Sequence, residues 1–145
     1  MYSRKSNKGF TLVEILIVVI ILGILAAIVI PQFTNASQDA RKSSLVSQLQ
    51  TLRSQIELFK LQHGDVLPDL VTDWTPMTTV TAYAGKNYGP YMQAIPINPL
   101  TGGSTVKDGT GAAAVAGADF IYDKTGGTGR IYGTSENVNG TKYVE

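Results

Sequence analysis

The sequence contains no cysteine, and its 145 residues include a single histidine, His63. Without cysteine, the chain can form neither a disulfide framework nor a thiolate metal site. One histidine supplies no multi-histidine metal site and no catalytic triad. The formal net charge of +1 argues against nucleic acid as a partner held by bulk electrostatics. We therefore expect a protein that is not an enzyme and that has no cofactor.

Charge is also scarce in one long segment near the N-terminus. From Phe10 to Ile30, only Thr11, Glu14 and Gly23 depart from the usual apolar residue types. At about 1.5 Å per helical residue, this run spans about 31 Å, close to the hydrocarbon thickness of a bilayer. The residues before it include three basic side chains and no acidic one: Arg4, Lys5 and Lys8.

Two ordinary explanations of such a segment are incomplete. A secretory signal has an apolar core of about 7–15 residues followed by a small-residue cleavage site, whereas this run is longer and leads into Pro31-Gln32-Phe33. A simple transmembrane anchor of a binding module fits the length and keeps the basic end cytoplasmic. It gives no reason for Glu14, because an unpaired ionised carboxylate inside a membrane span is costly.

The stretch Gly9-Phe10-Thr11-Leu12-Val13-Glu14 resembles the processing motif of type IV prepilins and type II secretion pseudopilins. The resemblance implies that a membrane-embedded prepilin peptidase removes residues 1–9 by cutting between Gly9 and Phe10, and that Phe10 is then N-methylated. It also implies a single-pass protein of the bacterial inner membrane, in contact with lipid, with its N-terminus cytoplasmic and its head extracytoplasmic. Further expected partners are copies of the same chain in a helical filament, minor pseudopilins and an inner-membrane assembly platform.

The resemblance also assigns a role to Glu14. In this family, the carboxylate is thought to pair with the Phe10 amine of a neighbouring subunit. Such a buried charge pair would select the axial stagger among otherwise interchangeable apolar helices, as one buried polar residue sets register in a coiled coil. The alternative is that Glu14 reaches the lipid headgroups, because it lies near the membrane edge.

An α+β fold of pilin type is expected, with a long N-terminal helix packed on a small three-stranded antiparallel sheet. The helix runs from about Phe10 to Gln62, with an apolar part over residues 10–31 and an amphipathic part over residues 32–63. Gly23 and Pro31 are its weak points, where a kink is expected. An apolar stripe predicts the face that packs on the sheet: Leu45, Leu49, Leu52, Ile56 and Phe59. His63-Gly64 followed by Pro68 predicts the helix end.

The rest of the chain divides into a loop and a sheet. Residues 64–117 are rich in proline and glycine and are expected to be irregular. Within them, Tyr88, Tyr91, Met92 and Ile95 are expected to anchor the loop against the helix. Residues 118–145 contain three predicted strands, joined by glycine-rich links: Ala118 to Asp123, Arg130 to Thr134 and Thr141 to Glu145. The link Gly126-Gly127-Thr128-Gly129 lacks the Lys-Ser/Thr ending of a phosphate loop, so a hairpin turn is expected.

The sequence leaves two questions open: whether the chain binds calcium and whether it is glycosylated. Major pseudopilins often bind calcium in their C-terminal loops, and four carboxylates could offer oxygens: Asp108, Asp119, Asp123 and Glu136. Their spacing matches no ligand pattern, although Asp119 and Asp123 share one predicted strand face. Asn35 and Asn139 also lie in glycosylation patterns, which are frequent by chance.

The interpretation favoured by the sequence is a structural subunit of a type IV pilus-like filament that serves as the major pseudopilin of a type II secretion system and drives protein export. The short head, the "IPINP" segment at residues 95–99 and the absence of a C-terminal cysteine pair favour this branch. The alternatives are a type IV pilus subunit for adhesion, motility or DNA uptake, and a simple membrane-anchored binding module.

Overall fold

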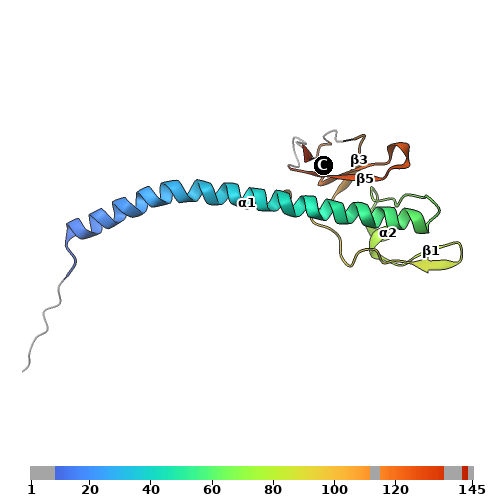
Figure 1. Ribbon diagram of the computed structural model, residues 1–145, viewed down its shortest axis with the longest axis horizontal. Helices are drawn as coiled ribbons and strands as arrows, with labels where there is room; N and C mark the ends of the chain where they lie inside the picture. Colours follow the sequence, from blue (N-terminus) through green and yellow to red (C-terminus); the bar gives the residue numbers. More distant parts are fainter. Residues whose placement is uncertain (1–8, 112–114, 136–141, 144–145) are drawn as a thin grey trace, which may run out of the picture. The chain divides into compact units, whose positions relative to one another are not determined.

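The computed structural model describes residues 9–111, 115–135 and 142–143. Its internal contacts divide the chain into two compact units, residues 1–38 and residues 39–145, and the second unit is called the head below. One helix, α1 (Leu12–Gln62), contributes to both units (Figure 1). Glu136 and Asn139, candidates for metal binding and glycosylation, lie outside the described residues.

In the first unit, α1 continues through both expected weak points. Gly23 and Pro31 lie inside a single helical element. Pro31 has no amide proton, so the Ala27 carbonyl loses its usual helical donor. Thr34, close to this interruption, donates its hydroxyl to the Ile30 carbonyl at 3.2 Å. A kink at Gly23 or Pro31 stays a prediction.

The head is built on the predicted apolar stripe of α1. All five of its residues are buried, which confirms the prediction: Leu45, Leu49, Leu52, Ile56 and Phe59. They pack in one core with strand residues that include Phe120, Tyr122 and Ile131. Fully burying an aliphatic or aromatic side chain of this size contributes roughly 1.5–3 kcal/mol. The stripe therefore supplies much of the stability of the head.

The helix ends where the sequence predicted. Gly64 adopts a left-handed conformation with φ of 62°, which a glycine accepts without steric cost. The Asp65 amide donates back to the Lys60 carbonyl at 2.9 Å. This six-to-one bond is part of the Schellman arrangement that satisfies orphaned carbonyls at a helix C-terminus.

The sheet of the head has four strands in the order β3 (Val106–Asp108), β4 (Phe120–Asp123), β5 (Arg130–Thr134) and β6 (Lys142–Tyr143). β4, β5 and β6 form the predicted antiparallel part, with a short 3-10 turn (η1, Thr125–Gly127) between β4 and β5. The α+β layout and the hairpin turn are thus confirmed. The predicted number of strands is wrong, because β3 adds a fourth strand that pairs in parallel with β4.

The region 64–117 is more regular than expected. Besides β3 it contains α2 (Thr75–Thr78) and an antiparallel hairpin of β1 (Thr81–Tyr83) and β2 (Lys86–Tyr88). Ala84 and Gly85 turn this hairpin, with φ values of 47° and 76°. Positive φ at both central residues is typical of a two-residue hairpin turn, for which Asn-Gly is the usual signal. Alanine at the first position hid the turn in the sequence.

Tyr91 is one of the residues that anchor the loop to α1. Its ring lies 5.3 Å from the ring of Phe59, and its hydroxyl donates to Gln62 Oε1 at 2.7 Å. Met92 is partly buried against the same core, and the ring of Tyr88 lies 5.5 Å from that of His63. These contacts confirm three of the four expected anchors.

The prediction that Ile95 is a fourth anchor of the loop is wrong. Its side chain is 51% exposed and that of Ile97 is 60% exposed, whereas Asn98 is fully buried. In this extended segment, alternate residues face opposite sides. Asn98 uses the inward position to donate to the carbonyls of Asp119 and Thr134 at 2.8 and 2.7 Å. A polar cross-link takes the place of the expected apolar anchor.

Candidate functional site

Thr11 and Glu14 form a hydrogen-bonded box at the start of α1. The Glu14 Oε2 atom accepts from the Thr11 amide and from the Thr11 hydroxyl, each at 2.8 Å. In return, the Thr11 Oγ1 atom accepts from the Glu14 amide at 3.2 Å. Thr11 is the residue before the helix and Glu14 is its third helical residue. This arrangement is a capping box, which satisfies two amides that a helix N-terminus leaves without partners.

The capping role of Thr11 was missed in the sequence, although the signal was there. The spacing Thr-x-x-Glu ahead of an apolar run is the sequence pattern of a capping box. The box also explains why α1 begins at Leu12, two residues after the predicted start at Phe10. Glu14 uses only Oε2 in the box, and within the described residues its Oε1 atom accepts no hydrogen bond.

The expected cleavage point lies just outside this cap. Gly9 and Phe10 precede the helix, and Phe10 is 84% exposed. A Cβ atom added to Gly9 would meet nothing within 4 Å. The peptide bond between the two residues is therefore accessible, and Phe10 precedes Glu14 by four positions in the sequence. The roles of Gly9, Phe10 and Glu14 in processing and register stay predictions.

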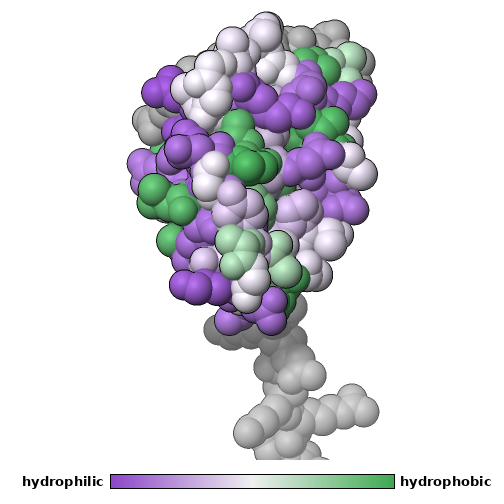
Figure 2. Space-filling view, turned by 90° about the vertical axis from the view of Figure 1, so that its right-hand side faces the viewer, coloured by the Kyte–Doolittle hydropathy of each residue, from purple (hydrophilic) through white to green (hydrophobic). Residues whose placement is uncertain are grey.

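Between Ile15 and Ile30, the surface of α1 is apolar on all sides. No charged residue occurs between Glu14 and Asp39, and the large apolar side chains from Leu12 to Ile30 are exposed in every direction. The helix is long and apolar enough to cross a membrane. By contrast, the side of the head seen in Figure 2 is mainly hydrophilic, with separate apolar patches. An apolar surface of this extent needs lipid or other apolar helices to cover it.

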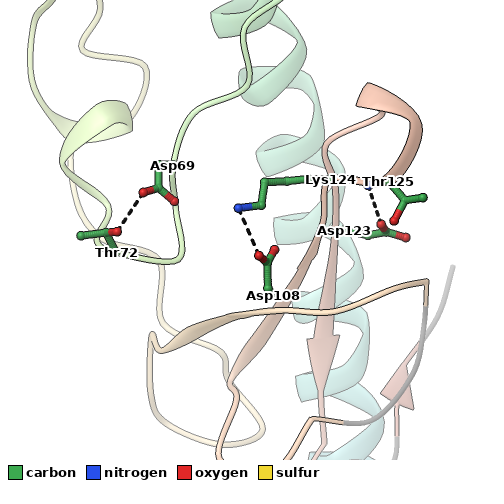
Figure 3. Close-up of polar contacts among 6 residues, drawn as sticks. All are labelled: Asp69, Thr72, Asp108, Asp123, Lys124 and Thr125. Atoms are coloured by element: carbon green, nitrogen blue, oxygen red, sulfur yellow. Dashed lines mark hydrogen bonds and ion pairs between the residues drawn. The ribbon is translucent and has the colours of Figure 1, made fainter.

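The candidate calcium ligands that the structure describes do not come together in the head. Among the residues that the structure describes, no three histidine, cysteine, aspartate or glutamate side chains group around a common point. Asp119 directly precedes β4 and Asp123 is its last residue, so the two are about 13 Å apart at 3.3 Å per residue. Asp108 forms an ion pair with Lys124 at 3.2 Å (Figure 3).

Asp123 is held by amides of two loops. Its Oδ1 atom accepts from the Thr125 amide at 2.8 Å, and its Oδ2 atom accepts from the Gly111 amide. The hydrogen bonds from Thr125, followed by the one from Gly111, lower the pKa of the Asp123 carboxyl from its ordinary value, because they favour the charged form. This carboxylate therefore fastens the chain after β3 to the turn after β4.

His63 has a structural environment. Its ring stacks on Phe59 with centroids 3.9 Å apart. Its Nδ1 atom lies 2.9 Å from the Phe59 carbonyl, and its Nε2 atom lies 2.9 Å from the Thr81 hydroxyl. The single histidine thus ties the β1–β2 hairpin to the end of α1, in keeping with the absence of a triad in the sequence.

Comparison with known proteins places these features in a family. Residues 4–30 match the model of the prokaryotic N-terminal methylation motif. The chain is 39% identical over 61 residues to the type II secretion system core protein G of Dickeya chrysanthemi, covering 42% of this chain and 40% of that protein. It is 39% identical over 82 residues to the type IV major fimbrial protein FimA of Dichelobacter nodosus, covering 57% and 52%.

One relative matches over a larger share of both chains. The core protein G of Vibrio cholerae is 32% identical over 104 residues, covering 68% of this chain and 69% of that protein. The chain spans less than two thirds of the Dickeya and Dichelobacter relatives. No solved structure matches significantly. The methylation motif, the apolar first part of α1 with its capped glutamate, and the match across two thirds of the Vibrio protein lead to one conclusion: the chain belongs to the type IV pilin-like proteins, in the family of the type II secretion system core protein G.

Proposed function

We propose that the chain is the major pseudopilin of a type II secretion system, a structural subunit that polymerises into a filament and drives protein export. The observation that carries this proposal is the first part of α1, up to Ile30, which is apolar on all sides apart from one carboxylate in its first turn. A lipid bilayer covers such a helix before assembly, and neighbouring copies cover it in a filament. The similarity to core protein G of Vibrio cholerae supports the same function.

Processing prepares the N-terminus for assembly. In our proposal a prepilin peptidase hydrolyses the peptide bond between Gly9 and Phe10, which leaves a carboxylate on Gly9 and a new amine on Phe10. A methyltransferase activity then transfers one methyl group to this amine from a sulfonium methyl donor, which leaves as a thioether while the amine loses one proton. The exposed, non-helical conformation of both residues supports access by a peptidase. The apolar helix remains attached to the head after the cut.

Glu14 then sets the register between subunits. The box with Thr11 uses Oε2 and holds the side chain at the helix start. Oε1 is the atom that would accept from the protonated Phe10 amine of a neighbouring subunit. A carboxylate in an apolar bundle needs a cationic partner, so a stagger that brings the two groups together is favoured over others. In the competing arrangement, Glu14 stays at the lipid headgroups and sets no stagger.

The location and partners follow from the same proposal. The N-terminus lies in the cytoplasm, α1 crosses the inner membrane, and the head lies on the extracytoplasmic side. The subunit meets lipid, the prepilin peptidase, minor pseudopilins and an assembly platform before it joins copies of itself. Repeated contacts between different surfaces of identical subunits build an open helical filament.

A role as a type IV pilus subunit is the second candidate. The similarity to FimA of Dichelobacter nodosus covers 57% of this chain and favours it. Deleting the gene in its host separates the two. A pseudopilin predicts that exported proteins accumulate inside the cells while surface pili persist, and that the wild-type gene restores export. Loss of pili with normal export would assign the chain to a pilus. Normal export and normal pili would leave a membrane-anchored module and contradict both.

A further inference from the structure

Two lysine side chains of the head donate hydrogen bonds to carbonyls of its loops. Lys60 donates to the Gly127 carbonyl in the turn after β4, at 2.9 Å. Lys107 donates to the Ala116 carbonyl in the connection between β3 and β4, at 2.8 Å. Carbonyls in such turns are the oxygens that a loop-bound cation would use. In this head, the carbonyls of Gly127 and Ala116 already accept hydrogen bonds from lysine side chains.

Two carboxylates near these loops also have partners within the head. Both oxygens of Asp123 accept backbone amides, from Thr125 and from Gly111. Asp108 faces the Lys124 ammonium at 3.2 Å. Figure 3 shows this ion pair beside the Asp123–Thr125 hydrogen bond at the end of β4. A divalent cation placed at Asp108 would be repelled by the ammonium next to it.

Asp119, the third candidate that the structure describes, lies at a different place in the head. It is buried, and its Oδ2 atom accepts from the Thr105 amide at 2.8 Å. Its carboxyl group lies so close to Gly103 that a Cβ atom there would overlap it. Gly103 and Thr105 precede β3, whereas Gly111 follows it. Asp119 and Asp123 therefore cannot ligate the same ion, and calcium prefers six to eight oxygens.

We infer that the head fastens its C-terminal loops with its own ammonium and amide groups, with Lys124 at Asp108 and backbone amides at Asp123, and that its stability does not depend on calcium. This sets the chain apart from the calcium-binding behaviour that the pseudopilin resemblance implied. The inference concerns the folded head alone, so it stands or fails independently of processing and secretion.

Thermal unfolding of the full chain in detergent micelles tests the inference, with circular dichroism as the signal. One sample contains millimolar calcium and the other contains EGTA. Binding at about 100 times the dissociation constant would raise the melting temperature of a domain this size by on the order of 10 °C. We expect the two melting temperatures to agree within about 1 °C. A rise of several degrees with calcium would overturn the inference.

Two variants with matched controls test the fastening groups. Asp123→Asn removes the charge that both amides bind, and Asp65→Asn is its control on an exposed loop aspartate. Lys124→Met removes the ammonium at Asp108, and Lys86→Met is its control on an exposed strand lysine. We expect Asp123→Asn to melt several degrees lower and Lys124→Met about 1–3 °C lower, since an exposed pair contributes little. Each decrease should be equal in calcium and in EGTA, with the controls unchanged. A decrease that appears only in calcium, or no decrease in either variant, would contradict the inference.

Discussion

Thr11 and Glu14 bind each other in both directions across the first turn of α1. Two hydrogen bonds of 2.8 Å run from Thr11 to Glu14 Oε2, and one of 3.2 Å runs from the Glu14 amide to Thr11 Oγ1. The negative charge thus sits at the positive end of its own helix dipole, where it is favoured. Glu14 is therefore both a helix cap and, in the proposed filament, a register group.

These two roles of Glu14 can be separated by one substitution. Glutamine at the third helical position also completes a capping box, so Glu14→Gln keeps the cap and removes the charge. We expect this variant to be processed and inserted normally but to form few or no filaments, because no charge remains for the Phe10 amine. Electron microscopy of sheared filaments measures the outcome. Normal filament yield from Glu14→Gln would rule out the register role.

Thr11→Ala tests the cap itself. Alanine has no side-chain oxygen to accept the hydrogen bond from the Glu14 amide. Loss of a threonine cap costs about 1 kcal/mol. We expect hydrogen exchange of the amides in the first turn of α1 to speed up several-fold, while the head is unaffected. Thr11→Ser, which keeps the hydroxyl, is the control. Equal exchange in Thr11→Ala and Thr11→Ser would show that the box does not hold the helix start.

The buried stripe of α1 predicts large effects on head stability. Leu52 is 1% exposed, and Leu52→Ala leaves a cavity that costs about 2–5 kcal/mol. For a domain of this size the melting temperature should fall by at least about 5 °C. Leu61 is on the same helix but 75% exposed, so Leu61→Ala should change little. Similar melting temperatures for the two variants would contradict the packing described for α1.

Asn98 provides a test of the polar cross-link in the loop. Asn98→Ala removes the buried side-chain donor to the carbonyls of Asp119 and Thr134. The Asp119 carbonyl keeps the amide and the hydroxyl of Thr134 as donors. An unsatisfied buried polar group costs about 1–3 kcal/mol, so the head should be destabilised by about 1–3 kcal/mol. Asn87→Ala, on an exposed position of β2, is the control. An Asn98→Ala head as stable as the control would show that the segment is held by other contacts.

The lowered pKa of Asp123 predicts how stability depends on pH. The unfolded chain binds a proton at Asp123 near its ordinary pKa of 3.8, before the folded chain does. The stabilisation is therefore fully present above this pH and is lost as the pH falls below it, through the lower pKa of the folded state. The difference in melting temperature between the wild type and Asp123→Asn should shrink below about pH 4. A difference that stays constant down to pH 2.5 would contradict this assignment.

Features set by local periodicity were readable from the sequence. The stripe from Leu45 to Phe59 follows the helical repeat and needs no knowledge of its partner. His63-Gly64 ends the helix through a local backbone conformation. The motif from Gly9 to Glu14 is contiguous, so the expected site could be located, and the spacing of Thr11 and Glu14 contained the capping box as well.

Features set by distant contacts were not readable. β3 is three residues long and exists because it pairs with β4, after an intervening loop. Asp123 is fixed by the Gly111 amide, twelve positions away. The inward position of Asn98 depends on the carbonyls of Asp119, just before β4, and of Thr134 in β5. In each case the side-chain types alone permit several arrangements, and tertiary contacts select one.

The mass of the mature protein tests the central claim most directly. The wild-type chain is purified from membranes of cells that contain an active prepilin peptidase and is measured by intact-mass spectrometry. We expect the loss of residues 1–9 and the gain of one methyl group. Gly9→Val should retain the leader without disturbing the fold, since a side chain at Gly9 meets no neighbour within 4 Å. A wild-type chain that keeps residues 1–9 in those cells would contradict the assignment as a processed filament subunit.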